Sequence, residues 1–455
     1  MPRQFWVETL GCPKNQVDSD KLTGTLLADG MVAADGPAEA DVVVVNTCAF
    51  IEAARQESID VILALDGARK RGAELVVTGC MAERYGPELA EAMPEITRVA
   101  PFGAPLAGPL PDPSAEPVPP GGDLRGQPVQ LGPTRSRAGT DASGGLALPA
   151  FDLLELPRPA ATAPWAYVKV AEGCDRNCGF CAIPSFRGAQ RSRSMASILT
   201  EIDALGAVQE VVLVAQDLAA YGRDQGRGSR QIVPLIRAVA ERVPWVRLLY
   251  LYPSDLTDEL VDTILETGVP YFDLSLQHVS PPLMRRMRRW GSGEVFAQRI
   301  AEIRRREPGA AFRSNFIVGY PGETEDDHDA LLAFVAGTGL DWCGFFAYSE
   351  EAGTHGATLE PKVPAGLVDE RLAELRDLQD SITASRRDDL IGTAATVLVD
   401  RPGVARSVRE APEIDGIVTV PPDLAPGRFH PVTIIDALGP DLVAAPVDSP
   451  QGGRS

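Results

Sequence analysis

The chain has 455 residues, 44% of them hydrophobic, which is enough for two or three domains with cores of their own and excludes a disordered or fibrous protein. Its 43 basic and 63 acidic residues give a net charge of −20, which argues against a large nucleic-acid footprint and suits a basic partner. No apolar run is long enough to span a bilayer and no secretion signal stands at the amino terminus, so we expect a cytoplasmic protein without membrane contact.

The first hundred residues alternate short β-type runs with helix-like stretches, and this pattern predicts a parallel α/β domain over 1–100. The β-type runs lie at 4–9, 41–46 and 74–77. Residues 101–160 are rich in Pro, Gly, Ala and Ser, a composition that cannot bury much apolar surface. We therefore expect a linker or an insertion at 101–160.

A sixfold repeat of β-type runs, each followed by a helical stretch, occupies 161–388. Such βα repetition predicts a parallel barrel, complete or partial, with its site at the carboxyl ends of the strands. The six runs lie at 166–170, 210–215, 246–252, 271–276, 311–318 and 342–347. From 389 to 455, β-rich runs separated by Pro and Gly predict a small all-β module.

Seven cysteines without a secretion signal favour metal or redox chemistry over a disulfide framework. Cys174, Cys178 and Cys181 form a C-x3-C-x2-C loop just after the first predicted barrel strand. Three thiolates in one loop can hold three irons of a 4Fe-4S cluster and leave the fourth iron open, as a catalytic cluster requires. A zinc site is the alternative, but it needs a fourth nearby ligand, and the nearest histidine is His278.

Cys12, Cys48 and Cys80 are far apart in the sequence, but each closely follows a predicted strand of the first domain. The ends of parallel strands lie side by side, so the three sulfurs can converge in the crevice where open α/β sheets bind ligands. This arrangement predicts a second three-cysteine metal site, with three buried structural thiols as the alternative. Cys343 lies within the sixth barrel run, and we expect it in the core.

The cysteine loop that opens a sixfold βα repeat resembles the radical S-adenosylmethionine superfamily, and the amino-terminal three-cysteine domain and terminal β module narrow the resemblance to the methylthiotransferases. Four stretches are similar to the branch that modifies an aspartate of ribosomal protein S-twelve. They are LGCPKNQVDS at 10–19, IPSFRG at 183–188, YFDLSLQH at 271–278 and APEIDG at 411–416.

This resemblance implies an N-terminal parallel α/β domain, a partial (β/α)6 barrel and a C-terminal TRAM-like module. It also implies two 4Fe-4S clusters, S-adenosylmethionine as cofactor and a low-potential electron donor. The cluster at Cys174, Cys178 and Cys181 would cleave S-adenosylmethionine to a 5′-deoxyadenosyl radical, and the cluster at the other three cysteines would deliver the methylthio sulfur. The implied partner is ribosomal protein S-twelve or the small ribosomal subunit.

Polar groups at the predicted strand ends are candidates for holding S-adenosylmethionine, although each could instead cap its strand. The candidates are Gln216, Ser275, Gln277 and Asn315, and Phe180 could pack on the adenine or shield the cluster. We expect His278 to be structural.

Arginines flank these candidate residues. The basic run at 285–289 is typical of a solvated helix face. Arg187, Arg191 and Arg193, by contrast, are expected near the barrel opening, because they follow closely on the cysteine loop.

Two other functions compete with this interpretation. A methylthiotransferase acting on tRNA adenosine should carry a basic RNA-docking module, whereas 390–455 holds five Arg, no Lys and eight Asp or Glu. We therefore expect Glu410, Glu413 and Asp415 to lie on a face that docks a basic protein. A non-catalytic iron–sulfur carrier should complete the ligand set of each cluster, which neither cysteine set does.

Overall fold

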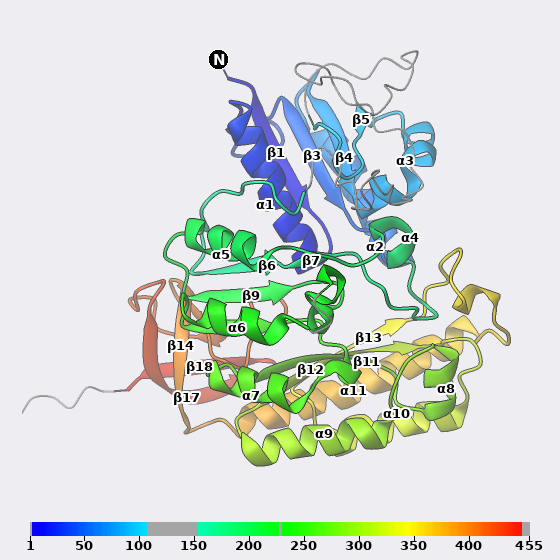
Figure 1. The fold of residues 1–455 in the computed structure, drawn as a ribbon, viewed down its shortest axis with the longest axis vertical. Coiled ribbons are helices and arrows are strands. Elements are labelled where there is room, and N and C mark those ends of the chain that lie inside the picture. The colour runs from blue at the N-terminus through cyan, green and yellow to red at the C-terminus, as the bar shows by residue number, and fades with distance from the viewer. Residues whose placement is uncertain (1, 107–152, 227–229, 448–455) are drawn as a thin grey trace, which may run out of the picture. The chain divides into compact units, whose positions relative to one another are not determined.

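The computed structural model describes residues 2–106, 153–226 and 230–447 (Figure 1). They form two compact units. Of the described residues, the amino-terminal unit comprises 2–106, 153–159, 172–174 and 182–189, and the carboxy-terminal unit comprises the others. Most of the expected linker, 107–152, lies outside the described residues. The described part contains no helix long and apolar enough to cross a membrane.

A five-stranded parallel sheet forms the centre of the amino-terminal unit, as predicted. Its order is β2-β1-β3-β4-β5. The strands are β1 (Gln4–Thr9), β2 (Val32–Ala33), β3 (Val42–Thr47), β4 (Glu74–Gly79) and β5 (Arg98–Val99).

Helices cover both faces of this sheet, because every side chain of β3 is buried and successive residues point to opposite faces. The helices are α1 (Pro13–Ala28), α2 (Glu52–Ala68) and α3 (Cys80–Ala92). Val42 and Val44 share a hydrophobic core with residues of α1. Val43 and Val45 pack instead with residues of α2 and α3. Leu153, at the end of the expected linker, also belongs to the α1 core.

Six parallel strands in sequence order form the centre of the carboxy-terminal unit. They are β6 (Trp165–Lys169), β9 (Glu210–Val214), β10 (Trp245–Leu248), β11 (Tyr271–Gln277), β12 (Ala311–Val318) and β13 (Trp342–Ala347). Strands β6, β9 and β10 form one sheet and β11, β12 and β13 another. A parallel bridge between Leu251 and Leu274 joins the two sheets. This continuous parallel order confirms the predicted partial (β/α)6 barrel.

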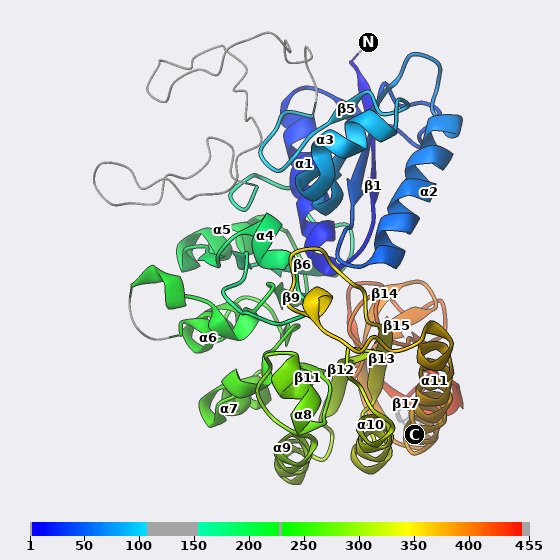
Figure 2. The same ribbon diagram turned by 90° about the vertical axis from the view of Figure 1, so that its right-hand side faces the viewer.

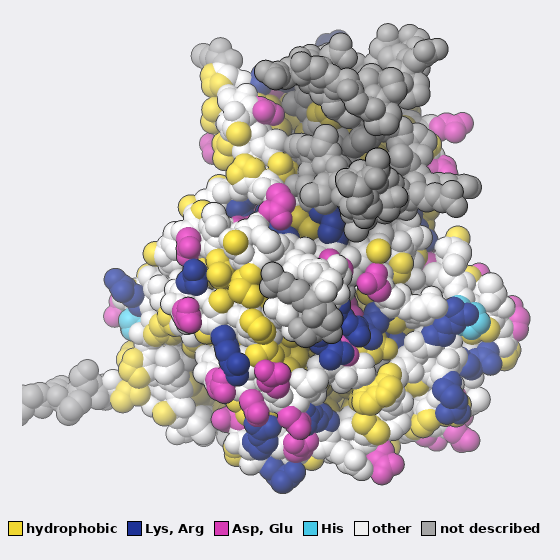
Figure 3. All heavy atoms as spheres, in the orientation of Figure 1, with side chains coloured by type: hydrophobic (Ala, Val, Ile, Leu, Met, Phe, Trp, Pro, Cys, Tyr) yellow, Lys and Arg dark blue, Asp and Glu magenta, His cyan; other side chains and the backbone are white. Residues whose placement is uncertain are grey.

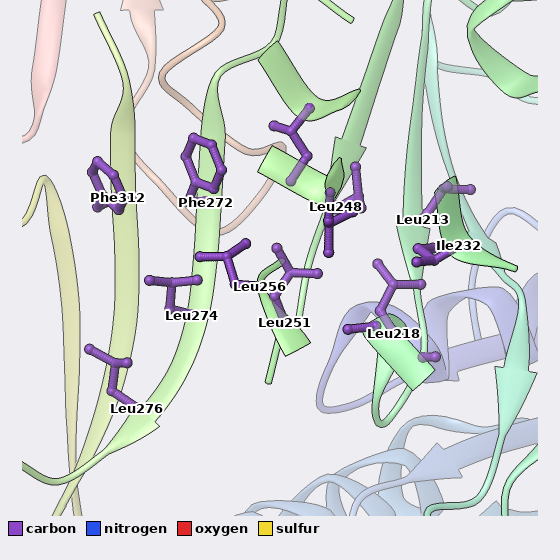
Figure 4. Packing of buried hydrophobic residues seen from close by; sticks show 14 of the residues in the cluster. Leu213, Leu218, Ile232, Leu248, Leu251, Leu256, Phe272, Leu274, Leu276 and Phe312 are labelled. Carbon is purple, nitrogen blue, oxygen red and sulfur yellow. The ribbon is translucent and has the colours of Figure 1, made fainter. Parts of the chain in front are cut away.

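The helices of the repeat pack outside these strands (Figure 1). They are α5 (Met195–Ala204), α6 (Ile232–Ala240), α7 (Asp258–Glu266), α9 (Gly293–Arg306), α10 (Glu325–Thr338) and α11 (Ala365–Asp388). Figure 4 shows part of the intervening core, including Phe272 and Phe312 on neighbouring strands. Their rings stack with centroids 5.2 Å apart. Phe272 and Phe312 face the surrounding helices. Because successive side chains of a strand point to opposite faces, the polar residues next to them in the sequence face the barrel interior.

The terminal module is a closed β barrel, which confirms the predicted all-β fold. Its strands are β14 (Ala394–Arg401), β15 (Val404–Arg406), β16 (Val418–Thr419), β17 (Phe429–Leu438) and β18 (Asp441–Pro446). Strand β17 contacts α11, and the two lie close together in Figure 2.

Buried polar contacts fix this module to the amino-terminal ends of the barrel strands. The carboxylate of Glu210, the first residue of β9, lies 2.6 Å from both Arg247 and Arg406, and all three side chains are buried. The hydroxyl of Tyr271, the first residue of β11, donates to Asp415 at 2.6 Å. The module therefore packs at the end of the barrel opposite the carboxyl ends of its strands.

The expected acidic docking face at 410–415 is wrong for two of its three residues. Glu410 is fully buried and pairs with Arg387 at 2.6 Å. Asp415 has a side chain that is 1% exposed and pairs with Arg313 at 3.3 Å. Only Glu413 is exposed. The barrel supplies the basic partners that we had expected from another protein.

Candidate active site

The three amino-terminal cysteines stand at the carboxyl ends of three neighbouring strands. Cys12 precedes the first turn of α1, Cys48 directly follows β3 and Cys80 opens α3. The register pairs Thr9 with Asn46 and Thr47 with Gly79, so the strands end side by side. The sheet thus brings together three residues that are 68 positions apart from first to last.

Glycine precedes two of these cysteines because the chain turns too tightly there for a side chain. Gly11 and Gly79 both have a positive φ, which glycine tolerates and other residues rarely adopt. A Cβ at Gly11 would lie 3.1 Å from Sγ of Cys48, and one at Gly79 would lie 2.3 Å from Oδ1 of Asn46. The backbone therefore approaches the thiols closely.

Polar side chains hold the cysteine-bearing loops in place. The Asn15 amide donates to the carbonyl oxygens of Leu10 and Thr47, at 2.8 and 3.1 Å. The backbone N–H of Cys48 donates to Oγ of Ser58 at 3.2 Å, and that hydroxyl donates to the Cys48 carbonyl at 3.1 Å. These bonds join the loops after β1 and β3 and fix Cys48 against α2.

The three thiols differ in acidity although they influence one another. Burial raises the pKa of Cys48 to about 12, with further contributions from the negative charges of Cys12 and Cys80. Burial also raises the pKa of Cys80, against the opposing charge of Arg187. For Cys12, burial opposes ionisation, but Lys14, nearby backbone N–H groups and Arg187 lower its pKa. The mutual effects indicate that the three sulfurs lie within electrostatic range of one another.

Arg187 is the charged partner of this cysteine group. It ends α4 (Ile183–Arg187), and its Nη2 lies 3.0 Å from Sγ of Cys80. Its Nη1 lies 3.2 Å from Asp18 and 3.0 Å from Glu172. The sequence indicated Arg187 only through its closeness to the cysteine loop and gave no sign of these partners.

The second cysteine set lies in the loop between β7 (Ala171–Glu172) and α4. The N–H of Cys174 donates to the carbonyl of Gly188 at 3.1 Å, and that of Cys181 donates to the carbonyl of Cys178 at 3.2 Å. Nη1 of Arg289 lies 3.3 Å from Sγ of Cys178. The expectation of a solvated basic run at 285–289 is therefore wrong for Arg289.

Both cysteine sets fit an iron–sulfur cluster in the chemistry of their donors. Each offers three thiols, and each has one arginine N–H within 3.3 Å of a sulfur. Within the described ranges, no three His, Cys, Asp or Glu side chains are placed to hold a metal ion. A cluster differs from an ion because each thiolate binds a separate iron, so its ligands need not meet at one point.

Two of the candidate cofactor residues, Ser275 and Asn315, occupy inward-facing positions on neighbouring barrel strands. Ser275 follows buried Leu274 on β11, whereas Gln277 lies beyond a register shift of this strand and has a positive φ. On β12, Asn315 occupies a half-buried position equivalent to that of Ser275, and its Oδ1 is buried without a hydrogen-bond partner among the described residues. It stands beside Gly344 of β13, where a Cβ would come within 2.6 Å of that oxygen. A buried acceptor without a partner is unusual in a protein and is explained if a bound ligand donates to it.

The other candidates have different surroundings. Gln216 follows the end of β9 and is half-buried. Phe180 packs beside a small buried cluster that includes Met287 and Tyr320. His278 is fully buried, and its Nδ1 accepts from the N–H of Ser280 at 3.1 Å, which supports the structural role expected for it.

Arg191 and Arg193 were expected near the barrel opening. Arg193 is buried, pairs with Glu201 at 2.7 Å and donates to the Lys169 carbonyl at 3.0 Å. It therefore holds the chain against α5 and is not available to a substrate. Arg191 lies half-buried in β8 (Arg191–Ser192).

Sequence reasoning missed a polar cavity of about 290 Å³ beside the cysteine loop. Arg176, from within that loop, spans Asp217 and Asp255 and lies 3.7 Å over the ring of Tyr252. Asp175, Gln190 and Asp217 also line the cavity. The position of Asp217 directly after Gln216 was the available signal, because it places a carboxylate at the end of a barrel strand.

Comparison with known proteins agrees with this architecture. The chain matches the profiles of an uncharacterized protein family, UPF0004, over 4–100, the radical SAM superfamily over 168–335 and the TRAM domain over 391–447. The fold and the matched profiles define an enzyme of the radical S-adenosylmethionine class. Among solved structures, a likeness to the radical S-adenosylmethionine methyltransferase TsrM of Kitasatospora setae has a TM-score of 0.47 at 14% identity, covering 94% of this chain and 82% of that one.

Full-length relatives narrow the class to one family. The ribosomal protein uS12 methylthiotransferase RimO of Cutibacterium acnes is 40% identical, covering 97% of each chain. That of Moorella thermoacetica is 41% identical, over 92% of this chain and 93% of its own. That of Salinispora arenicola is 42% identical, over 98% of this chain and 95% of its own. The chain belongs to the family of ribosomal protein uS12 methylthiotransferases.

Proposed function

We propose that the chain converts a C–H bond of ribosomal protein uS12 to C–SCH3, at the β carbon of an aspartate. The observation that carries this proposal is a sequence identity of about 40% to uS12 methylthiotransferases over nearly the full chain. The two three-cysteine sets and their separate strand-end settings support it. uS12 is the S-twelve protein expected from the sequence.

Each cysteine set has its own role in this proposal. Cys174, Cys178 and Cys181 would hold the cluster that, when bound, supplies the electron for cleavage of S-adenosylmethionine. Cys12, Cys48 and Cys80 would hold the second cluster, from which the methylthio sulfur comes. The carboxyl ends of β1, β3 and β4 position the second set, and the loop after β7 carries the first.

The inner face of the barrel would bind S-adenosylmethionine. We assign this role to Ser275, Gln277 and Asn315, with Gln216 at the end of β9 and Phe180 beside the cysteine loop. The unpaired Oδ1 of Asn315 supports the assignment because a buried acceptor without a partner costs stability unless a ligand satisfies it.

The proposal also includes a partner, an electron donor and the domain boundaries. The partner would be uS12 or the small ribosomal subunit in the cytoplasm, and a low-potential electron donor would reduce the clusters. The boundaries between the amino-terminal domain, the linker, the barrel and the terminal module would fall near residues 100, 160 and 388. Because Glu410 and Asp415 are buried, the choice of uS12 over tRNA now depends on the relatives and no longer on the acidic module.

A deletion strain tests the substrate directly. Mass spectrometry of uS12 and of tRNA should show a missing methylthio group on uS12 only, restored by the wild-type gene and not by the variant lacking Cys174, Cys178 and Cys181. Loss of the modification from tRNA would contradict the proposal. A purified protein that fails to cleave S-adenosylmethionine under dithionite would instead support the non-catalytic carrier.

A further inference from the structure

A buried guanidinium lies against one of the amino-terminal cysteines. Nη2 of Arg187 is 3.0 Å from Sγ of Cys80 and 3.2 Å from Oδ1 of Asn15. Nη1 faces the other way, 3.2 Å from Asp18 and 3.0 Å from Glu172. All these residues belong to the amino-terminal unit. Each terminal nitrogen therefore has its own set of partners.

The position of this guanidinium is strongly constrained. The Arg187 side chain is 4% exposed, and its guanidinium carbon lies 4.0 Å from the centroid of the Phe102 ring. Asp18 and Glu172 form ion pairs with Nη1 and so oppose rotation of the fork. Arginine stays protonated in proteins, so the Cys80 sulfur has a permanent positive neighbour and a permanent N–H donor.

Reduction of a cluster adds one electron, and hydrogen bonds to its sulfurs together with local charge set its reduction potential. We infer that Arg187 is a positioning residue that raises the reduction potential of the cluster held by Cys12, Cys48 and Cys80, through its N–H donation to the Cys80 sulfur. This inference rests on the proposed function. Arg187 itself touches no reacting atom.

The same geometry gives Asp18 the opposite effect. Its buried carboxylate is a negative neighbour of Cys80 and competes for the Arg187 charge. Removal of that carboxylate should make reduction easier, whereas removal of the guanidinium should make it harder. A merely structural role for Arg187 gives no reason for two shifts of opposite sign.

The experiment uses the full chain with Cys174→Ala, Cys178→Ala and Cys181→Ala, so that one cluster remains. An anaerobic redox titration followed by electron paramagnetic resonance gives its midpoint potential. Arg187→Met should lower the equilibrium constant for reduction at least tenfold, a shift of about −59 mV for one electron. Asp18→Asn should shift the potential in the positive direction.

The matched control is Arg158→Met, which removes another buried arginine of the same unit, one that pairs with Asp20 rather than with a cysteine. Its potential should equal that of the parent. If Arg187→Met keeps its iron and the parent potential, the inference is wrong.

If Arg187→Met loses its cluster, the midpoint potential of Asp18→Asn is the result that tests the inference. An unchanged or more negative potential in that variant overturns the inference. A parent protein that binds no iron overturns the proposed second cluster, and the inference with it. Iron content measured before each titration distinguishes these results.

Discussion

The carboxylate of Glu410 lies 2.6 Å from the guanidinium of Arg387, and both side chains are almost fully buried. Arg387 belongs to α11 and Glu410 to the segment after β15, so this ion pair connects the last barrel helix with the terminal module. Glu410 also accepts hydrogen bonds from the N–H and hydroxyl of Ser407, at 2.8 and 2.6 Å. This ion pair explains why Glu410 adds to the acidic composition of the terminal module without adding a negative charge to its surface.

Glu410→Lys should therefore destabilise the protein, because it places two positive charges together in a buried site. Breaking a buried ion pair costs about 3–5 kcal/mol. Thermal unfolding should show a lower first transition, and limited proteolysis should release the module. Glu413→Lys, at the exposed neighbour, is the control and should change little. Equal stability of both variants would contradict the buried pair.

Iron content tests the two-site proposal. Anaerobically reconstituted protein should bind about eight irons, and the variant lacking Cys174, Cys178 and Cys181 about four, because two 4Fe-4S clusters would assemble independently. Iron and sulfide analysis measures both. A variant with no iron at all would rule out separate sites.

The division of labour between the cysteine sets has its own test. A variant with Cys12→Ala, Cys48→Ala and Cys80→Ala should still produce 5′-deoxyadenosine from S-adenosylmethionine, yet transfer no methylthio group to uS12. Chromatography of the nucleoside and mass spectrometry of uS12 follow the two reactions separately. A methylthiolated product from this variant would make the amino-terminal thiols structural.

The unpaired Oδ1 of Asn315 predicts an effect on cofactor affinity. Gly344→Ala would put a methyl group 2.6 Å from Oδ1 of Asn315 and 2.9 Å from the ring of Phe346, so we expect S-adenosylmethionine to bind roughly tenfold or more weakly, a loss of about 1.4 kcal/mol. Equilibrium binding measures this change. Gly337→Ala, where a Cβ meets nothing within 4 Å, is the matched control. Unchanged affinity in Gly344→Ala would place the cofactor elsewhere.

His278 predicts a pH dependence of stability. Burial lowers its pKa to about 4, with Asp327 opposing the shift and His328 and Arg371 adding to it. Between that value and the ordinary 6.5, the unfolded chain binds a proton that the folded chain does not. Stability is therefore lost as the pH falls through this window.

The His278 contribution amounts to about 2 kcal/mol between pH 7 and pH 5. His278→Gln should reduce the acid sensitivity by that amount, measured as the difference between urea unfolding curves at the two pH values. If the wild type and the variant lose equal stability, the buried histidine is not neutral.

On the face drawn in Figure 3, surface charge gives no separate indication of the partner. Figure 3 shows basic and acidic side chains interspersed over the visible face of the described residues. The net charge of −20 therefore does not locate a docking surface on this face.

The sequence alone determined the features that depend on local periodicity and spacing. Apolar and polar residues alternate in runs such as 272–276, so strands could be predicted along the chain. The C-x3-C-x2-C spacing joins Cys174, Cys178 and Cys181 through one short loop, which requires no knowledge of distant contacts. Parallel strand order then predicted the grouping of Cys12, Cys48 and Cys80, because strand ends at one edge lie close together.

Only the tertiary structure decided which charges meet. Arg187 and Cys80 are 107 positions apart, and Glu210 and Arg406 are 196 apart, so no local pattern relates them. From composition we expected Glu410 and Asp415 to be surface charges, because most carboxylates are exposed. In the structure each is buried beside an arginine, and this ion pair offsets the cost of removing the carboxylate from water. The residue type determines which side chains can carry a charge. Contacts between distant parts of the chain determine whether that charge is buried and which group it pairs with.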